Sequence, residues 1–467
     1  MSLPPQFLDE IRARVPLSRV IGRKVVWDLR RSNQAKGDWW APCPFHGEKT
    51  ASFHVDDQKG FYYCFGCHAK GDALTFLREA EGLGFIEAVE LLAAEAGTGP
   101  LDFRDVDRLA IRIGGQVRDW EPETYFNRQQ IVLYDKFTQF TLLAAREAVE
   151  QSGLIFEGEL GLRSGVVLGT AAGGMNTWDE NYRTVYEEGK NRVHPFVVPR
   201  LMNNAACSHL SMEYGLLGPS FTVATACASS NHAMGMAFNM VRSGAATVML
   251  TGGSEAMLCF GGVKAWEGLR VMSKDACRPF SATRNGMVQG EGAGVFVFED
   301  WEHAVARGAD ILAEVVGFSM CADAQDIVMP SAIGAERAIT GAMQDAHVRP
   351  EEIGYINAHG TGTAANDKTE CAAVAHAFGH HADRLMISST KSMHGHLIGG
   401  TGAVELLACI MALRDGVIAP TIGYEEPDPE CALDVVPNEA REARVEAVLS
   451  NAFAFGGLNA VIALRKA

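Results

Sequence analysis

Four residues in two close pairs have the spacing of metal ligands. Two residues separate Cys43 from His46, two separate Cys64 from Cys67, and 17 residues lie between the pairs. Thiolate sulfur and imidazole nitrogen suit Zn²⁺, and four such ligands leave no open coordination position. The spacing therefore predicts a structural zinc site with each pair on a tight turn. The alternative is chance spacing among free cysteines.

A second chemically suggestive residue is Cys227, in the segment TVATACASSNHAMG. A stretch with strand propensity precedes it and a helical stretch rich in small residues follows, which predicts that the sulfur lies at a helix N-terminus. There the helix dipole and the free backbone N–H groups favour a thiolate. The same N–H groups can stabilise an oxyanion. A lone cysteine is more often a small buried apolar residue, so this site needs independent support.

Two histidines in glycine-rich segments supply that support. His359 ends a predicted strand in YINAHGTGT, and His396 lies in STKSMHGHLIGGTGA, with Lys391 five residues before it and Glu405 nine residues after it. Histidines in helices are often only hydrogen-bonded polar groups, and we keep this reading for His394. One cysteine with two glycine-flanked histidines indicates a thiol enzyme.

Alternating strands and helices must position these residues. Such alternation predicts layers of α/β structure. The predicted strands are Gly165–Leu168, Thr247–Thr251, Gly294–Phe298, Ile311–Val316, Tyr355–Ala358, Met386–Ser389, Ala447–Asn451 and Ala460–Leu464, and the predicted helices cover 137–152, 228–242, 335–346, 366–378 and 402–414.

The first hundred residues have a different pattern. Segment 5–30 is helix-like and then strand-like, and residues 50–64 alternate around an Asp-Asp-Gln-Lys-Gly turn, which predicts a hairpin that joins the two ligand pairs. Helical patterns follow at 72–80 and 85–96. The run AGTGPLD at 96–102 is the best candidate for a linker.

Charge divides the chain in the same place. The net charge is −16 over 467 residues, yet residues 11–70 hold 11 basic and 5 acidic side chains, a balance of +6. Such a patch suits a nucleic-acid surface, and the alternative is a solvated basic face. The length allows two or three domains. No apolar run of roughly 20 residues could span a membrane, and the charged start predicts no signal peptide, so we expect a cytoplasmic protein with reduced cysteines.

Aromatic and lysine side chains interleave around the zinc ligands. Rings beside lysines suit stacking on single-stranded bases. The alternative is that rings form the core of a small domain, which we expect for at least half of them. The rings are Trp39, Trp40, Phe53, Tyr62, Tyr63 and Phe65, and the lysines are Lys49, Lys59 and Lys70.

The run APCPFHGEKTASFHVDDQKGFYYCFGCHAKGDALTF closely resembles the zinc-binding domain of bacterial DNA primase. The resemblance covers roughly residues 1–97 and implies a small zinc-ribbon-like α+β domain. It implies that the two pairs bind zinc and that the domain contacts single-stranded DNA, with Lys49, Lys59, Tyr62 and Lys70 as candidate contacts. No acidic catalytic segment of primase type follows, so primer synthesis is not expected.

Residues from about 103 to 467 resemble a β-ketoacyl-acyl carrier protein synthase. TACASS, AHGTGT, STKSMHGH and NAFAFGG match in order, and KAWEGLRVMSKDACRPFSATRNGMVQGEGAG favours the nodulation-type branch. The resemblance implies a thiolase-like layered α/β fold with two related halves, 103–310 and 311–467, after a junction at 98–102. It also implies a homodimer and no cofactor for condensation.

This second resemblance implies a decarboxylative Claisen condensation in fatty acid or related lipid synthesis. Cys227 would accept an acyl chain from acyl carrier protein, and His359 and His396 would stabilise the enolate formed from malonyl carrier protein. Lys391 and Glu405 would form a buried pair that keeps the histidine tautomers fixed.

The acyl pocket would be controlled by the segment NAFAFGGLNA. The backbone N–H groups of Cys227 and Phe455 would hold the oxyanion, and Phe455, with Phe453 nearby, would gate the pocket. Ala454 stands where the family usually has glycine, and Leu458 where it usually has threonine. The added bulk is expected to slow the gate or to alter chain-length choice.

The junction departs from the family pattern. The first strand of the family is replaced by the primase-like domain, and we expect its loss from the interior of the first half's sheet. The free-energy cost of such a loss is large compared with a free energy of unfolding of about 5–15 kcal/mol. Three readings follow: a condensing enzyme with a zinc domain, a zinc-dependent single-stranded DNA-binding fragment with an inactive synthase half, or a non-functional fusion.

Overall fold

The computed structural model describes residues 15–22, 24–33, 36–46, 50–80, 97–118 and 120–467. The chain divides into two compact units, Met1–Gly99 and Pro100–Ala467, and the division falls inside the junction expected at 98–102. The predicted helix at 85–96 lies outside the described residues, as does the start of segment 5–30.

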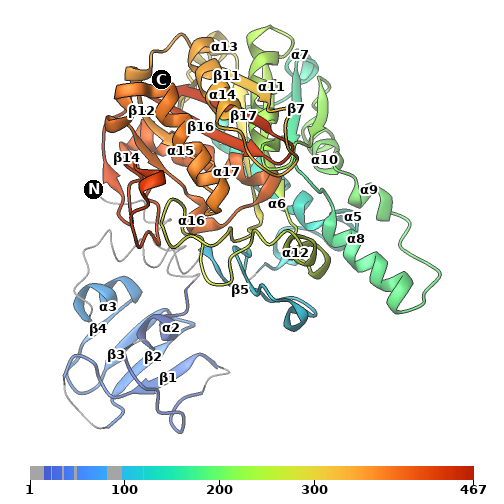
Figure 1. Ribbon diagram of the computed structural model, residues 1–467. Coiled ribbons are helices and arrows are strands. Elements are labelled where there is room, and N and C mark those ends of the chain that lie inside the picture. Colours follow the sequence, from blue (N-terminus) through green and yellow to red (C-terminus); the bar gives the residue numbers. More distant parts are fainter. Residues whose placement is uncertain (1–14, 23, 34–35, 47–49, 81–96, 119) are drawn as a thin grey trace. The chain divides into compact units, whose positions relative to one another are not determined.

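The first unit is built on an antiparallel sheet (Figure 1). Its strands follow in order as β1 (Asp38–Ala41), β2 (Phe53–Asp56), β3 (Phe61–Cys64) and β4 (Lys70–Gly71). Helices α2 (Leu17–Ile21) and α3 (Ala73–Ala80) pack on each other. The β2–β3 hairpin and the helix near 72–80 confirm two predictions. Phe53, Tyr62 and Phe76 are fully buried and form the core of the unit.

The second unit contains two mixed sheets. The first has the order β10-β9-β7-β8, from β7 (Ser164–Gly169), β8 (Ser220–Val223), β9 (Val248–Glu255) and β10 (Gly292–Glu299). The second has the order β11-β17-β16-β12-β13, from β11 (Glu314–Ala322), β12 (Ile353–Asn357), β13 (Met386–Ser388), β16 (Ala447–Ala454) and β17 (Leu458–Arg465).

Long helices cover the two sheets. Helices α11 (Ser229–Arg242) and α17 (Thr401–Asp415) contact both sheets and each other, so they form the central layer. Helices α6 (Lys136–Ser152) and α10 (Ala205–Tyr214) lie against the first sheet, and α14 (Ala332–Asp345) lies against the second, with α15 (Ala364–Phe378) packed beside α14. The five alternating layers confirm the thiolase-like α/β fold (Figure 1).

The predicted segments match these elements closely. Each of the eight predicted strands overlaps an observed one, although β11 begins at Glu314 and not at Ile311. The helix predicted at 137–152 is α6, and Gly153 ends it in a left-handed conformation with φ of 67°. No helix in the described part of the chain is long and apolar enough to cross a membrane.

The remaining elements are short connections. They are β5 (Gly99–Pro100), η2 (Val106–Arg108), β6 (Ile113–Gly114), η3 (Pro122–Thr124), α5 (Arg128–Leu133), α7 (Gly158–Leu162), α8 (Met175–Tyr182), η4 (Arg183–Glu187), α9 (Val197–Leu201), α12 (Phe260–Glu267), α13 (Trp301–Ala306), η5 (Pro350–Glu352), η6 (Gly379–Arg384), α16 (Lys391–His394), η7 (Ile398–Gly400), β14 (Val417–Ile418), η8 (Pro429–Cys431) and β15 (Arg441–Glu442).

The two sheets have corresponding strand orders, and this correspondence corrects one expectation. Strands β10, β9, β7 and β8 occupy the places of β17, β16, β12 and β13, and the second sheet adds β11 beside β17. Among the described residues, no strand lies in the equivalent place beside β10. The missing strand therefore belongs at the edge of the sheet and not in its interior. Loss of an edge strand leaves the other ladders paired, because no two remaining strands are separated.

Candidate functional site

Cys227 lies in the turn between β8 and α11, two residues before the helix begins. The preceding Ala226 has a φ of 47°, which is uncommon for a residue with a side chain. Such conformations cost about 1–3 kcal/mol and persist where the surrounding structure requires them. The expected position of the sulfur near a helix N-terminus is therefore observed, on a tight turn.

The fold brings three distant residues together. The reactive atoms of Cys227, His359 and His396 all lie within 4.8 Å of one another, and all three residues are buried. His359 follows β12, and His396 lies between α16 and η7. The two imidazole rings are 5.6 Å apart between centroids and almost perpendicular, at 83°. The catalytic cluster predicted from the sequence is thus assembled from both halves of the second unit.

Burial dominates the chemistry of the Cys227 thiol. It raises the pKa of Cys227 to about 12, although the Lys391 charge and the backbone N–H groups of Phe455 and Cys227 act in the opposite direction. The sequence favoured a thiolate at this position. The structure corrects that expectation, because desolvation of the charged form outweighs the helix N-terminus. The two N–H groups do face the sulfur, as an oxyanion site requires.

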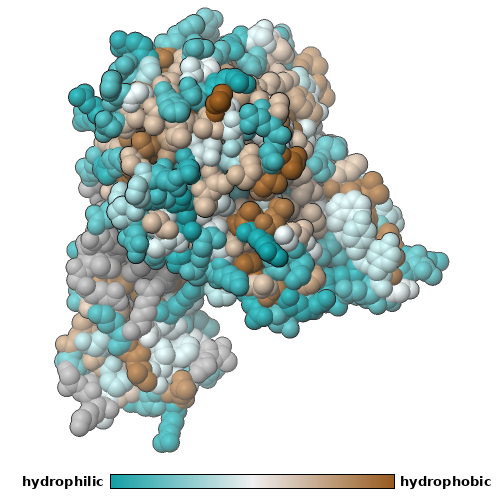
Figure 2. Space-filling view, viewed as in Figure 1, coloured by the Kyte–Doolittle hydropathy of each residue, from teal (hydrophilic) through white to brown (hydrophobic). Residues whose placement is uncertain are grey.

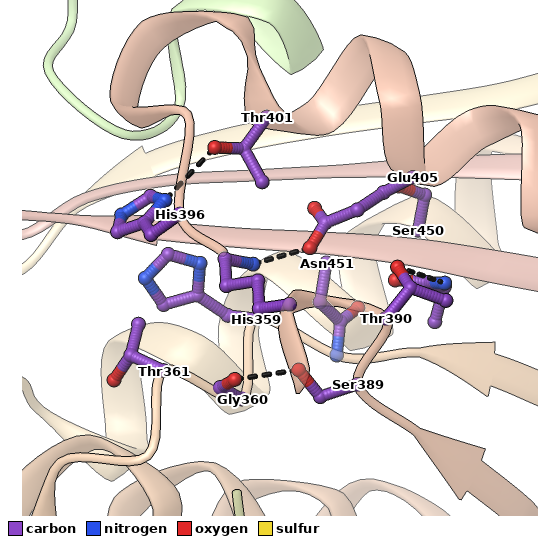
Figure 3. Close-up of polar contacts among 12 residues, drawn as sticks. His359, Gly360, Thr361, Ser389, Thr390, His396, Thr401, Glu405, Ser450 and Asn451 are labelled. Carbon is purple, nitrogen blue, oxygen red and sulfur yellow. Dashed lines mark hydrogen bonds and ion pairs between the residues drawn. The ribbon is translucent and has the colours of Figure 1, made fainter. Parts of the chain in front are cut away.

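Both histidines are held in the neutral form. Burial lowers the pKa of His359 and of His396 well below the usual range, and the Lys391 charge lowers both further. The Nδ1 atom of His396 lies 2.8 Å from the Thr401 hydroxyl (Figure 3). Its Nε2 atom is buried without a hydrogen-bond partner among the described residues. That nitrogen is free to bond a substrate atom.

Lys391 and Glu405 form the expected buried ion pair (Figure 3). Burial raises the pKa of Glu405 to about 7, and Lys391 opposes this rise. Neither side chain hydrogen-bonds a histidine ring directly; Thr401 does so for His396. The pair therefore acts on the histidines through charge, and Thr401 supplies the hydrogen-bond partner of His396 Nδ1.

The sequence analysis missed Thr401 and also Glu370. The buried Glu370 carboxylate accepts hydrogen bonds from the backbone N–H of His359 at 2.8 Å and of Gly360 at 2.7 Å. It also accepts one from the Asn451 amide at 3.1 Å. A carboxylate on the helix after the His359 turn is a recognisable signal, but the sequence does not show which way it points.

The predicted gate lies in the hairpin that joins β16 and β17. Phe453 packs against His359, with ring centroids 6.1 Å apart. Phe455 stacks on Trp266 at 5.8 Å, with the planes 23° apart. Gly456 follows Phe455 with a φ of 85°. Phe453 therefore lies against His359 at the end of β16, while Phe455 lies at the turn and stacks on Trp266.

The four ligand candidates of the first unit also converge. Their donor atoms all lie within 4.8 Å of one another. The Sγ atoms of Cys43 and Cys67 are 3.7 Å apart, and a tetrahedral zinc site with bonds of about 2.3 Å separates two sulfurs by about 3.8 Å. Backbone N–H groups of Gly66 and Cys67 point at Cys64 Sγ, at 3.3 and 3.4 Å. The donor set and its geometry fit Zn²⁺.

The four residues predicted to contact nucleic acid differ in their burial and position. Tyr62 is fully buried in the core, so its ring cannot stack on a base, and we assign it to packing. Lys49 lies outside the described residues. Lys59 is exposed and pairs with Asp56 at 2.9 Å. Lys70 is exposed on β4.

A different set of aromatics is accessible. Phe65 is 59% exposed and stacks on Trp40 at 5.7 Å, with the planes only 13° apart. The Arg31 guanidinium lies over the Trp40 ring, 4.5 Å from its centroid. This platform, Trp40 with Phe65 and Arg31, combines flat rings with a cation, as single-stranded nucleic-acid sites do.

Known protein families match the chain in three places. Residues 94–304 match the β-ketoacyl synthase N-terminal domain, and residues 312–425 match the β-ketoacyl synthase C-terminal domain. Residues 3–104 match the CHC2 zinc finger family.

Curated relatives share the second unit. Nodulation protein E of Rhizobium sp. (strain N33) is 45% identical over 377 residues, which cover 81% of this chain and 94% of the relative. A 3-oxoacyl-[acyl-carrier-protein] synthase 2 of Synechocystis sp. is 39% identical over 384 residues, which cover 80% and 92%.

Solved structures agree with these matches. The ishigamide ketosynthase/chain length factor aligns with a TM-score of 0.76 at 34% identity, and covers 82% of this chain and 95% of that one. A type II polyketide ketosynthase solved in complex with its acyl-carrier protein aligns with a TM-score of 0.72 at 29% identity, with the same coverage.

Proposed function

The chain belongs to the β-ketoacyl synthase family of condensing acyltransferases, and we propose that it elongates acyl chains by decarboxylative condensation on acyl carrier protein. One observation carries the proposal: a buried thiol and two neutral imidazoles have their reactive atoms within 4.8 Å. Each neutral imidazole can give one hydrogen bond to a developing oxyanion without holding an extra proton.

In the first step Cys227 takes the acyl group. Its sulfur bonds to the acyl carbon while the carbon–sulfur bond of the carrier thioester breaks. Because burial keeps Cys227 as a thiol, its proton passes to His359 and then to the leaving carrier thiolate. The N–H groups of Cys227 and Phe455 hold the oxygen charge of the tetrahedral intermediate.

In the second step malonyl carrier protein loses carbon dioxide. The breaking carbon–carbon bond leaves its electron pair on the thioester as an enolate, and the N–H groups of His359 and His396 donate to the enolate oxygen. Thr401 donates to Nδ1 of His396, which leaves the proton on the unpaired Nε2. The enolate carbon then attacks the Cys227 thioester, and the released thiolate takes a proton from solvent.

Acyl carrier protein is the proposed partner of this site. The similar type II ketosynthase was solved in complex with its acyl-carrier protein, and similar curated proteins are 3-oxoacyl-[acyl-carrier-protein] synthases. The acyl chain would lie beside Phe455, where Ala454 and Leu458 add bulk at the ends of β16 and β17.

The experiment follows both steps on the full-length chain. With acyl and malonyl carrier protein, the wild type is expected to release carbon dioxide and form a 3-oxoacyl product. Cys227→Ala should form no product yet still decarboxylate malonyl carrier protein, because both histidines remain. The control is Cys371→Ala, a buried cysteine on α15, which should keep full activity. A soluble wild type that forms no product would refute the proposal.

A second function is proposed for the first unit. We infer that Cys43, His46, Cys64 and Cys67 hold a structural zinc ion and that the unit binds single-stranded DNA through the Trp40 platform. The sulfur spacing and the CHC2 zinc finger match support the metal. The exposed ring stack supports the DNA contact.

Gel shifts with single-stranded DNA test this second function. Phe65→Ala should weaken binding by about 1–3 kcal/mol, the usual value of one stacked base. Phe61→Ala is the control, because Phe61 is also exposed, at 39%, but lies outside the platform. Retarded DNA without condensation activity would favour the inactive-synthase reading. An insoluble chain would favour a non-functional fusion.

A homodimer is also proposed for the second unit. The outer edge of β8 has no neighbour strand among the described residues, and its residues are exposed or half-buried. Apolar surface gathers nearby on the segment of α8 and α9, where Tyr186, Phe196 and Val198 are exposed (Figure 2). Sedimentation of the full chain tests this, and Phe196→Glu should weaken a dimer formed here.

A further inference from the structure

The outer edge of β10 lies in a cleft of about 670 Å³ inside the second unit. Six consecutive residues, Val295–Asp300, line the cleft. At roughly 3.3 Å per residue they extend over about 20 Å, the length of a short strand. Because alternate residues of an antiparallel strand point their N–H and C=O groups to one side, about three residues present backbone groups there that pair with no strand in the described part of the chain. Edges of this kind are templates for another strand.

The second half of the unit shows what covers such an edge. There β11 pairs antiparallel with β17 along the whole of Leu458–Arg465. Residues Asn459–Leu464 of β17 are consequently all buried. In β10, Val297 and Phe298 are only half-buried. The two strands occupy the same place in their sheets, and β10 differs because no strand beside it lies among the described residues.

The residues that line the cleft determine which kind of strand could bind there. Helix α6 lies on one face of the first sheet, and α11 and α17 lie on the other, and all three line the cleft. Phe238, Leu406 and Ile410 form apolar parts of the central wall. A strand covered on both faces is a continuous apolar run without alternation. The exposed Arg242 lies at the rim, and the Glu299 carboxylate is buried in an ion pair with Arg307.

We propose that the edge of β10 is an acceptor site for an apolar β-strand supplied by a separate polypeptide. The donor strand adds antiparallel to β10, as β11 adds to β17, and completes a five-strand sheet. This mode of recognition takes affinity from main-chain hydrogen bonds and specificity from side-chain pockets. It is separate from the proposed dimer, which uses β8 at the opposite edge of the sheet.

The repeat also predicts the register of the donor. Glu299 pairs with the first residue of β9, as Arg465 pairs with the first residue of β16. Val297 therefore corresponds to Ala463, whose partner in β11 is Gly317. A donor with the β11 sequence should place its Gly317 position opposite Val297.

A labelled peptide with the β11 sequence, residues 314–322 with Cys321→Ser, is the probe. Fluorescence polarisation with the full-length chain is expected to show saturable binding of one peptide per chain. The same peptide with Ser319→Pro should bind at least about tenfold more weakly, because proline removes a ladder donor. Position 319 is chosen because the neighbouring Phe318 N–H points away from β17 and bonds the Asp345 carboxylate. Saturation should raise the melting temperature of the second unit by about 4 °C at a hundredfold excess over Kd.

Two variants test whether the peptide binds at the edge of β10. Val297→Lys puts a charge into the cleft and should abolish binding, whereas Val305→Lys is the matched control on α13, where Val305 is 56% exposed. Their melting curves without peptide show that both fold. Val297→Cys should form a disulfide with a peptide that carries Gly317→Cys activated as a 2-thiopyridyl mixed disulfide, because the protein thiolate displaces the pyridinethione leaving group; Val305→Cys should not.

Several outcomes would overturn the proposal. They are no binding of the β11 peptide, equal binding of the proline peptide, or binding that Val297→Lys leaves unchanged. Binding of myristate that Val297→Lys removes would assign the cleft to an apolar small molecule. A wild-type oligomer that Val297→Lys dissociates would assign it to a second copy of this chain. None of these measurements depends on condensation activity, so their results neither support nor refute the proposed function.

Discussion

The surroundings of Cys227, the proposed nucleophile, work against ionisation of its thiol. Burial raises the pKa of its thiol, and only the Lys391 charge and two backbone N–H groups offset this. A neutral thiol beside neutral imidazoles is a consistent arrangement, because the proton can move within the cluster and no net charge is buried before substrate arrives. Reactivity then depends on substrate being in place, which protects the thiol from small electrophiles.

The pH dependence of alkylation tests this environment. With a pKa of about 12, the thiolate fraction of Cys227 is small at pH 7 and rises about tenfold per pH unit up to pH 10. Iodoacetamide labelling of the Cys227 peptide, followed by mass spectrometry at each pH, should show this slope. Free glutathione is the reference and should level off above about pH 9. If the alkylation rate of Cys227 also stops rising above about pH 9, the protein stabilises the thiolate and the prediction is wrong.

Thr401 is expected to orient His396 without touching substrate. Thr401→Val removes the one hydrogen bond that Nδ1 makes among the described residues, at 2.8 Å, and frees the ring to turn or change tautomer. The decarboxylation rate should fall about 10- to 100-fold. This is less than the usual effect of removing an oxyanion donor outright, because the His396 ring itself remains. Transfer of the acyl group to Cys227 should stay near the wild-type rate, which a general loss of structure would not allow.

The control for this prediction is Thr138→Val. The Thr138 hydroxyl is also buried but has no hydrogen-bond partner among the described residues, so its removal should leave both rates unchanged. If Thr401→Val slows both steps equally, Thr401 supports the fold and not His396.

At the scale of elements, the site depends on how closely α11 approaches β7. Gly169 ends β7, and a Cβ atom there would lie 2.3 Å from the backbone of Ser229 and of Ser230, the first residues of α11. Helix α11 begins just after Cys227. The glycine therefore sets the distance between the central helix and its sheet, and with it the position of the thiol.

Gly169→Ala is expected to push the start of α11 away from β7. Overpacking of this kind costs typically about 1–3 kcal/mol, and the displaced turn should lower the rate of Cys227 acylation. The measurements are urea unfolding and single-turnover acylation. Gly153→Ala is the control, since it has a φ of 67° but nothing within 4 Å, and should lose stability without a specific loss of acylation.

At the scale of the whole molecule, the two units have separate cores. Aromatic packing around Phe53, Tyr62 and Phe76 holds the first, and it is small enough to need a metal. The second has large cores shared by two sheets and five layers. The missing strand lies at a sheet edge, which explains how the second unit keeps a complete catalytic cluster.

Removal of zinc should therefore affect one unit only. The purified chain is expected to hold one zinc ion, and chelation or Cys43→Ser should abolish the melting transition of the first unit and leave that of the second in place. Elemental analysis and calorimetry measure both. Ser52→Ala, beside Cys64 Sγ but not a ligand, should keep the metal. A chain without zinc that shows both transitions would contradict the assignment.

Local sequence patterns predict the chemistry proposed for this protein. Cys227, His359, His396 and the paired zinc ligands carry local signals, because the turns and glycines that position them are adjacent in the chain. The alternation of strands and helices likewise predicted the layered fold.

Only the tertiary structure decided what depends on distant neighbours. The pKa of Cys227, the partner of His396, the burial of Tyr62 and the edge position of the missing strand all follow from segments far apart in sequence. Desolvation and strand order are properties of packing, and no local pattern encodes them.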